Sequence, residues 1–317
     1  MTRSSARFLS YDLRPAKQAE RLMLIEYLRC STECGLKLAD YRYVGMGGNR
    51  FYDFMLLHRF IGIKKMVSLE HDDDMYLRSS FNNPFDFIEV SNSSVEDFLA
   101  QDNYDGPSIF WLDFDGGISQ QTISDIQSLG VIARPNSFFF ITLMGEYQKF
   151  LSDMNDADRL AWFQNELGDV GQNLSQDDVQ VSKSHDTIFK CVSTALSSAF
   201  AFRGDGIFSA QFSVRYSDSM KMITTGGFFG AMGSAAEIAL RRNTCLPNLS
   251  KSEQELFYLR NFNVTERERG LLDIAATAKD RRRKEWKKLR ELGFKDRDID
   301  AYGDLLRFNP RYIESIL

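Results

Sequence analysis

The sequence predicts an α/β fold in which a doubly wound, mostly parallel sheet of seven strands ends in an antiparallel hairpin and is followed by a C-terminal helical region. Two observations support this prediction. Five apolar runs of strand length are continuous, as expected for strands buried on both faces of a parallel sheet, and each precedes a segment with helical character. Two further strand-like segments are separated only by a short turn, which favours an antiparallel pair.

The first regular element is predicted to be a helix over residues 15–30. Pro15 suits the first turn of a helix, where its missing N–H is not needed. Further along, Ala19, Met23 and Cys30 recur at helical spacing.

The parallel part of the sheet is predicted from the order of the apolar runs. The expected strands are residues 41–45, 65–69, 87–90, 108–112 and 138–143. The expected helices between them are residues 51–57, 73–81, 95–99 and 120–129. Parallel strands need crossover connections, which are almost always right-handed, so this alternation builds a doubly wound sheet.

The last two strands follow a helix expected at residues 188–199. They span residues 208–216 and 220–225, with the turn-like residues 217–219 between them. A connection this short allows only antiparallel pairing, so the sheet is predicted to end in a hairpin.

The C-terminal region is predicted to be helical. Glycines between residues 226 and 233 mark a transition in composition. Two capping boxes follow, Ser250-x-x-Glu253 and Thr265-x-x-Glu268, which are typical of helix starts. We expect a short helix after the first box and one long helix after the second, which ends near Leu292 because Gly293 favours a helix C-terminus.

Composition excludes several classes of protein. With 43% hydrophobic and 26% charged residues, the chain is neither disordered nor collagen-like. The longest apolar run, residues 138–144, is too short to cross a membrane, and no apolar signal core follows Met1, so we expect a soluble, cytoplasmic protein. Four cysteines do not form a disulfide framework in a chain of 317 residues, and we expect Cys30 and Cys34 to be thiols on a helix face.

Charge divides the chain into two predicted parts. Residues 235–317 carry 18 basic and 14 acidic residues, whereas residues 1–234 carry 21 and 30. We therefore expect an α/β domain over residues 1–234 and a helical region over residues 235–317. Within the latter, Arg281–Arg290 is strongly basic and could contact the phosphates of a nucleic acid; the alternative is a solvated helix face anchored by Trp286.

A nucleotide site is predicted where the first two strands end. Gly45, Gly47 and Gly48 follow the first strand and precede a helix, so the backbone can approach a ligand closely and the helix offers unpaired N–H groups. Glu70 follows the second strand, where nucleotide-binding sheets place an acid that accepts the ribose hydroxyls. Arg50 stands where a dinucleotide fingerprint would have its third glycine, which disfavours a pyrophosphate ligand.

These features resemble the class I S-adenosylmethionine-dependent methyltransferases, a Rossmann-like superfamily, and within it the O-methyltransferases. The resemblance covers roughly residues 38–230. It rests on the glycine turn at residues 44–48, on Glu70, on the stretch after the third strand at residues 88–98, on Leu112-Asp-Phe-Asp-Gly-Gly after the fourth, and on the terminal hairpin. Such a hairpin after a parallel αβ run is typical of this family and not of dehydrogenases.

The resemblance implies S-adenosylmethionine as cofactor. The glycine turn would line its methionine and ribose part, Glu70 would hold the ribose, serines after the third strand would lie beside the adenine, and Asp113 would face the transferred methyl group. The implied cofactor-binding residues are Gly45, Met46, Gly47, Gly48, Glu70, His71, Ser93, Ser94 and Asp113.

Asp113 and Asp115 are the candidate catalytic residues. Methyl transfer to a hydroxyl requires a positioned acceptor and a group that removes its proton, which a carboxylate at a strand end can do. O-methylation is therefore favoured. The two carboxylates could instead hold Mg²⁺, but no third oxygen ligand can be assigned, and a divalent metal is not favoured.

Three charged residues near the site have two interpretations each. His71 could flank the adenine or act as a base, or it could be a surface residue. Lys17 and Arg21, on the first helix, could meet a carboxylate over the cofactor, but we expect ordinary surface placement.

The sequence thus favours a methyltransferase whose helical tail recognises an unidentified acceptor. The alternative is a non-catalytic module with the same fold that binds a nucleotide or nucleic acid. A nicotinamide-dependent oxidoreductase is a weaker third interpretation, since the dinucleotide fingerprint is incomplete.

Overall fold

The computed structural model describes residues 14–309 except 219, 248, 250–255, 261 and 263. The strands are β1 (Arg42–Gly45), β2 (Lys65–Leu69), β3 (Ile88–Ser91), β4 (Ser108–Asp113), β5 (Ser137–Met144), β6 (Ile207–Ser217), β7 (Lys221–Gly230) and β8 (Phe257–Leu259). The helices are α1 (Pro15–Thr32), α2 (Tyr52–Ile61), α3 (Asp73–Asn82), α4 (Val95–Gln101), α5 (Gln120–Ile132), α6 (Lys149–Asp153), α7 (Asp156–Glu166), α8 (Asp169–Gln172), α9 (Ser184–Phe200), α10 (Met232–Cys245), α11 (Glu266–Thr277), α12 (Lys284–Glu291) and α13 (Asp296–Asp304).

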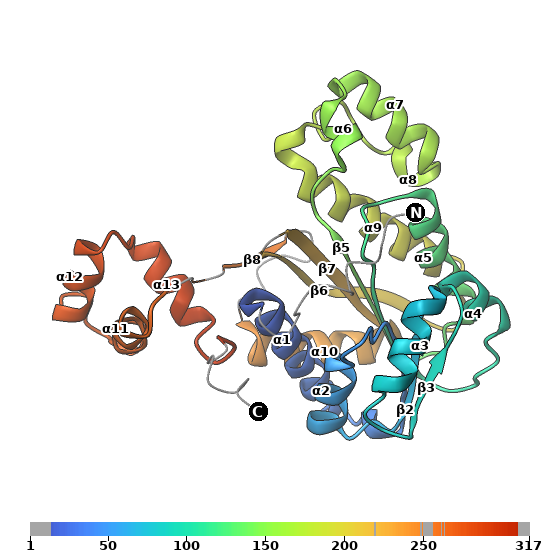
Figure 1. Cartoon of the computed structure of the whole chain (residues 1–317), viewed down its shortest axis with the longest axis horizontal. Helices are drawn as coiled ribbons and strands as arrows, with labels where there is room; N and C mark the ends of the chain where they lie inside the picture. The colour runs from blue at the N-terminus through green and yellow to red at the C-terminus, as the bar shows by residue number, and fades with distance from the viewer. Residues whose placement is uncertain are drawn as a thin grey trace.

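One sheet of strand order β3-β2-β1-β4-β5-β7-β6-β8 forms the centre of the molecule (Figure 1). The strands β1 to β5 are parallel, and β7 is antiparallel to both β5 and β6. The predicted α/β class, the doubly wound order and the antiparallel hairpin are therefore confirmed. The strand order reverses between β1 and β4, and in open α/β sheets ligands bind at such a switch point, outside the carboxyl ends of the strands.

The sheet has eight strands and not the predicted seven, because β8 pairs in parallel with β6. The hairpin is also longer than predicted, since Gly226 and Gly227 lie inside β7 and do not mark a transition. A Cβ atom would lie 2.7 Å from the Phe140 Cα atom at Gly226 and 2.9 Å from the Ala210 Cα atom at Gly227. Glycine at these positions thus permits a close approach of neighbouring strands.

Helices cover both faces of the sheet. Tyr43 and Phe138 belong to the apolar cluster that α1, α2 and α10 complete on one face. Val44 and Phe139, the next residues along, belong to the cluster with α4, α5 and α9 on the other face. Successive strand residues point to opposite faces, so strands that are apolar throughout fill both clusters.

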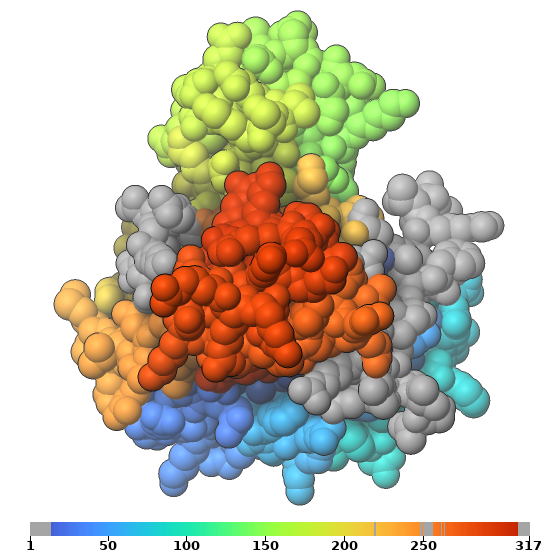
Figure 2. All heavy atoms as spheres, turned by 90° about the vertical axis from the view of Figure 1, so that its left-hand side faces the viewer, coloured from blue at the N-terminus to red at the C-terminus, as the bar shows by residue number. Residues whose placement is uncertain are grey.

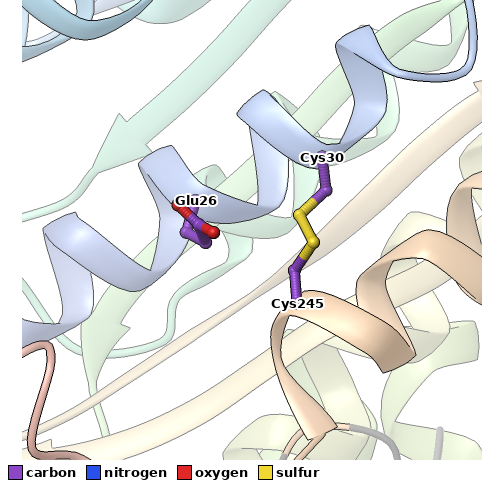
Figure 3. A group of neighbouring side chains, drawn as sticks. All are labelled: Glu26, Cys30 and Cys245. Atoms are coloured by element: carbon purple, nitrogen blue, oxygen red, sulfur yellow. A yellow bond between two sulfur atoms is a disulfide. The ribbon is translucent and has the colours of Figure 1, made fainter.

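A disulfide bond joins Cys30 of α1 to Cys245 of α10 (Figure 3). The expectation that Cys30 is a thiol is therefore wrong, whereas Cys34 is free as expected. The pairing was not visible in the sequence because the two cysteines are 215 residues apart and meet only after both helices pack on the same face of the sheet.

A small helical lobe between β5 and α9 was not predicted. It consists of α6, α7 and α8 and projects from the sheet domain (Figure 1). The guanidinium of Arg159, which is 1% exposed, donates hydrogen bonds to the Leu151 and Val179 carbonyl oxygens, at 2.7 and 2.8 Å, and pairs with Asp156. A buried arginine and an apolar cluster that includes Leu151, Phe163 and Val170 therefore hold the lobe together.

The C-terminal helices α11, α12 and α13 share a separate apolar cluster around Leu272, Trp286 and Tyr302. In Figure 2 they form one body, orange to red, in front of the sheet domain. The capping box at Thr265 is confirmed, and Gly293 has the left-handed conformation (φ 92°) expected after a helix. The box at Ser250 lies outside the described residues.

The predicted single helix up to Leu292 is wrong, because the chain leaves the helical conformation after Thr277 and α12 starts anew at Lys284. The break lets α12 fold back on α11, so that the Trp286 indole N–H donates to the Ala275 carbonyl oxygen at 2.9 Å. Burial of Trp286 against α11 outweighs continuation of a helix whose basic side chains would repel each other.

The division of the chain at residue 234 stays a prediction. None of the helices in the described ranges is both long and apolar enough to cross a membrane.

Candidate active site

A cavity of about 320 Å³ lies at the carboxyl ends of β1, β2 and β4, at the switch point of the sheet. Its size falls within the usual range for small-ligand sites, and its lining is a mixture of apolar and charged side chains. The lining residues are Arg21, Met46, Gly47, Gly48, Asn49, Arg50, Tyr52, Asp53, Leu69, Glu70, His71, Ser93, Ser94, Val95, Asp113, Phe114, Asp115, Gln121 and Asp125.

The glycine turn after β1 is held by the end of β2. The Gly47 N–H donates to the Ser68 hydroxyl at 2.9 Å, and the Gly48 N–H donates to Glu70 Oε1 at 2.7 Å. A Cβ atom at Gly47 would lie 2.8 Å from both the Ser68 hydroxyl and the Phe51 ring. Close packing of the turn against Ser68 and Phe51 therefore requires glycine at position 47.

Two residues of this turn adopt left-handed conformations. Gly48 has φ 54°, which costs glycine little, and Phe51 has φ 50°, which is unfavourable for a bulky residue. The ring of Phe51 is fully buried against Phe54, so packing compensates the backbone strain. Such strain commonly marks functional turns.

Two other predicted residues of the turn differ in position. Met46 lines the cavity. Gly45 does not, since it is buried at the end of β1, where a Cβ atom would lie 2.7 Å from the Tyr43 ring. Its direct contact with a cofactor stays a prediction.

Glu70 is buried at the floor of the cavity. It is 9% exposed, and burial raises its pKa to about 7, although the hydrogen bond from Gly48 works in the opposite direction. Ionisation of this buried carboxyl group therefore costs free energy, and additional hydrogen-bond donors would lower that cost. A ligand with two neighbouring hydroxyls supplies such donors.

The remaining residues predicted for the adenine side also meet at the cavity. Ser93 and Ser94 line it from the β3–α4 turn, where the Ser93 hydroxyl lies 2.9 Å from that of Ser91 and the Ser94 hydroxyl caps α4. His71 lines it as an exposed residue next to Glu70. Their contacts with a ligand stay predictions.

Asp113 and Asp115, the predicted catalytic pair, both line the cavity after β4. Asp115 is exposed, whereas the Asp113 side chain is 21% exposed and forms a 2.7 Å ion pair with Lys17 Nζ. Burial raises the pKa of Asp113, while the Lys17 ammonium lowers it and so favours the charged carboxylate. Asp113 is thus the better placed of the two to take a proton inside the cavity.

Surface placement of Lys17 and Arg21 is wrong, because both lie on the buried face of α1. The Lys17 side chain is 4% exposed, and the Arg21 side chain, also 4% exposed, pairs with Asp53 of α2. Burial opposes the charged form of Lys17, but Asp113 and Glu20 outweigh it and raise the pKa of the ammonium. The other interpretation is the one observed: Lys17 and Arg21 of the first helix each pair with a carboxylate beside the cavity.

Glu20 is a functional candidate that the sequence analysis missed. It is fully buried, and its Oε2 atom lies 3.5 Å from Lys17 Nζ, so the same ammonium serves Glu20 and Asp113. Burial raises the pKa of Glu20 to about 7. The signal available was its spacing of three residues from Lys17 on one helix, which by itself is common on helix surfaces.

Asp53, Gln121 and Asp125 are further lining residues that the sequence analysis missed. The Gln121 amide donates to Asp125 Oδ1 at 2.9 Å on the first turns of α5. Burial raises the pKa of Asp125, and the Gln121 hydrogen bond lowers it. Asp115 and Asp125 make the rim near α5 acidic.

The basic segment Arg281–Arg290 lies on the C-terminal helices. Three of its arginines form ion pairs within this region, Arg281 with Asp300, Arg282 with Asp280, and Arg290 with Asp296. Nucleic-acid binding there stays a prediction, and these pairs would compete with phosphates. Among the residues that the structure describes, one group has the spacing of metal ligands, Glu26 with Cys30 and Cys245 (Figure 3), whose sulfurs form the disulfide.

Comparison with known proteins gives a family and several solved structures of limited similarity. A family described as “Putative O-methyltransferase” matches residues 9–317. No curated protein matches the chain. The O-methyltransferase from Bacillus cereus, solved with S-adenosylhomocysteine, is 18% identical over 70% of this chain and 85% of that chain, with a TM-score of 0.39.

Two other solved methyltransferases are similar at lower identity. The plantazolicin methyltransferase BpumL is 7% identical over 68% of this chain and 85% of that chain, with a TM-score of 0.40. The N-methyltransferase NodS from Bradyrhizobium japonicum is 10% identical over 68% and 90%, with a TM-score of 0.37. The family match covers nearly the whole chain and confirms the resemblance found in the sequence. The chain belongs to this O-methyltransferase family.

Proposed function

We propose that the protein transfers a methyl group from S-adenosylmethionine to a hydroxyl group of an acceptor, and that the cofactor binds in the cavity at the switch point. One observation carries the assignment of the site. The N–H of the glycine turn and the carboxylate of Glu70 meet at 2.7 Å inside a cavity that also contains Asp113. Backbone donors, a ribose acceptor and a proton acceptor thus surround one space.

The residues present fit this cofactor. Gly47 and Gly48 line the cavity with backbone alone, and the Glu70 carboxylate can exchange its single backbone donor for two ribose hydroxyls. The carboxylates of Asp113 and Asp115 favour a ligand that carries a positive charge. When bound, the cofactor supplies an electrophilic methyl group on a sulfonium.

The protein's own residues then hold the acceptor and remove its proton. With the cofactor bound, Asp113 would hold the acceptor hydroxyl and would accept its proton as the oxygen takes the methyl group. Lys17 stabilises the charge of Asp113 beforehand through the 2.7 Å ion pair. Oxygen as the acceptor atom is supported by the family, and the identity of the acceptor molecule is open.

Calorimetric titration tests the cofactor. We expect the protein to bind S-adenosylhomocysteine and not NAD. Glu70→Ala should weaken this binding by about tenfold to a hundredfold, because hydrogen bonds to a charged group contribute about 1.5–3 kcal/mol each. Glu89→Ala is the matched control, since Glu89 is exposed on β3 and does not line the cavity, and it should bind as the wild type does. Full affinity of the Glu70→Ala protein would refute the ribose assignment.

A role of Arg281–Arg290 in binding a nucleic-acid acceptor is a separate part of the proposal. It predicts that a triple change of Arg281, Arg282 and Arg283 to Glu lowers the affinity for RNA. The same change should make this affinity less sensitive to the salt concentration. Unchanged affinity for RNA would contradict nucleic-acid binding by this segment.

We also propose a cytoplasmic location, as expected from the sequence. The Cys30–Cys245 disulfide is unusual for that compartment.

A further inference from the structure

Two carboxylates share one buried ammonium beside the proposed methyl position. Lys17 Nζ lies 2.7 Å from Asp113 Oδ2 and 3.5 Å from Glu20 Oε2. Asp113 faces the cavity, whereas Glu20 lies behind it, fully buried between α1 and the sheet. The net charge next to the cavity therefore depends on whether Glu20 is ionised and shares the ammonium of Lys17 with Asp113.

A chain of hydrogen bonds fixes Glu20 in this place. The Thr224 hydroxyl of β7 donates to Glu20 Oε1 at 2.6 Å, lies 2.8 Å from the Thr142 hydroxyl of β5, and Thr142 in turn accepts the Trp111 indole N–H at 3.0 Å. The ammonium of Lys17 lies 5.2 Å from the centroid of the Trp111 ring. The arrangement is therefore built into three strands of the sheet and does not depend on a loose surface contact.

We propose that the Lys17–Glu20 pair of α1 sets the net charge beside Asp113 and so determines how strongly the cavity prefers the sulfonium cofactor to its neutral product. This inference rests on the proposed function. Lys17 and Glu20 act through Asp113 and are positioning residues. When Glu20 is neutral, Lys17 compensates Asp113 fully; when Glu20 is ionised, the ammonium is shared and one negative charge remains near the sulfonium position.

Of the other charged groups near the pair, Glu70 also titrates near neutral pH, since burial raises its pKa to about 7, and it lines the same cavity on the β2 side. Arg21 of α1 and Asp53 of α2 pair with each other, and Tyr43 of β1 and Tyr216 of β6 have pKa values raised by burial, so they stay neutral. The group that titrates near neutral pH behind Asp113 is Glu20, since burial raises its pKa to about 7.

The direction of the effect follows from these charges. Above about pH 7 the ionised Glu20 leaves a negative charge that attracts a sulfonium, and below it the local charge is close to zero. The ratio of the affinity for S-adenosylmethionine to that for S-adenosylhomocysteine should therefore rise with pH. Coulomb energies at partly buried distances predict a rise of roughly fivefold across the titration. The amino and carboxyl groups shared by both compounds cancel in the ratio.

Titration of both compounds from about pH 5.5 to about pH 8.5 tests the proposal. In Glu20→Gln, which can still accept the Thr224 hydrogen bond, the ratio should rise less than in the wild type, because Glu70 alone then titrates; in Glu20→Gln combined with Glu70→Gln it should stay low throughout. Thr224→Val removes a bond that lowers the pKa of Glu20, and it should move the midpoint of the rise to higher pH. Glu33→Gln, an exposed change after the last turn of the same helix, should behave as the wild type does.

The outcomes separate the two proposals. A wild-type ratio that does not change with pH, or a Glu20→Gln ratio that rises as in the wild type, overturns the inference while leaving the cofactor assignment intact. Failure of the wild-type protein to bind either compound overturns the proposed function and this inference with it. Should Glu20→Gln fail to fold, the midpoint shift in Thr224→Val decides, and an unshifted midpoint contradicts the proposal.

Discussion

The two sides of the cavity are built in different ways. On the β1–β2 side, glycine backbone and Glu70 come from neighbouring strand ends, and one hydrogen bond of 2.7 Å joins them. On the α1–β4 side, Lys17 and Asp113 are 96 residues apart in the chain and form a buried ion pair. The first side is suited to recognise a neutral ribose through backbone and one carboxylate, and the second to control charge.

This difference predicts different responses to mutation. Buried ion pairs depend on both partners, because removal of one leaves an uncompensated charge in the interior. A glycine turn depends on space, so its failure should depend on the volume that is added. The following predictions use stability and binding to separate the two sides, and they run from the largest expected effect to the smallest.

The largest loss of stability is expected for Arg21→Met on the α1 side. It leaves the carboxylate of Asp53, whose side chain is 9% exposed, without its cation, and should lower the free energy of unfolding by about 3–5 kcal/mol. Urea unfolding measures this. The exposed pair of Arg241 with Glu33 is the control, and Arg241→Met should cost less than about 1 kcal/mol. Equal losses in both variants would show that burial of the Arg21 pair has no special role.

Removal of the disulfide should weaken the attachment of α1. The bond closes a loop across 215 residues, so Cys30→Ser together with Cys245→Ser should reduce stability by about 2–4 kcal/mol. Thermal unfolding with and without reductant is the measurement, and reductant should have no effect on the double variant. Cys34→Ser is the control, because Cys34 is free and partly buried. An unchanged melting temperature of the wild type under reduction would contradict this prediction.

Each side of the cavity carries one carboxyl group whose pKa is raised to about 7, Glu20 on the α1 side and Glu70 on the other. The folded chain keeps these protons between about pH 4.5 and pH 7, where the unfolded chain has lost them. Stability should therefore fall as pH rises through this window, by about 3 kcal/mol for each group.

Urea unfolding across this pH window tests the assignment of both groups. Glu20→Gln and Glu70→Gln should each make the fall shallower, and the double variant should remove most of it. Glu33→Gln is the control, with a fall equal to that of the wild type. A wild-type stability that rises over the same window would contradict the raised pKa values.

The smallest effect on stability is expected at the glycine turn. A Cβ atom at Gly47 would lie 2.8 Å from the Ser68 hydroxyl and the Phe51 ring, so Gly47→Ala should cost about 1–2 kcal/mol and weaken S-adenosylhomocysteine binding by about tenfold. Gly116→Ala is the control, since no atom lies within 4 Å of a Cβ atom there. Calorimetry compares the two variants, and equal affinities would show that the turn does not need glycine for binding.

Much of the fold could be predicted from the sequence because its signals are local. Continuous apolar runs such as residues 138–143 identify strands buried on both faces, and the short turn at residues 217–219 identifies the hairpin. The helical lobe at residues 149–172 was missed although Leu160, Phe163 and Leu167 recur at helical spacing, and the buried Arg159 that also holds it could not be predicted from sequence. The break after Thr277 was missed because both flanking segments have helical sequences, and tertiary packing of Trp286 decides between them.

The candidate site shows the same limit. Gly47, Glu70 and Asp113 each follow a predicted strand, and the carboxyl ends of parallel strands meet at one edge of a sheet, so their convergence could be predicted. The burial of Lys17 and Glu20 could not, because it depends on where α1 lies across the sheet. Nothing local in residues 15–30 distinguishes a charged residue over the site from one on the surface.

The central claim is that the cavity between the glycine turn, Glu70 and Asp113 holds the sulfonium cofactor. A crystal structure of the protein with S-adenosylhomocysteine tests it most directly. We predict that the ribose hydroxyls lie within hydrogen-bond distance of Glu70 and that the sulfur lies next to Asp113. Nucleoside density at any other place, with this cavity filled by side chains, would contradict the claim.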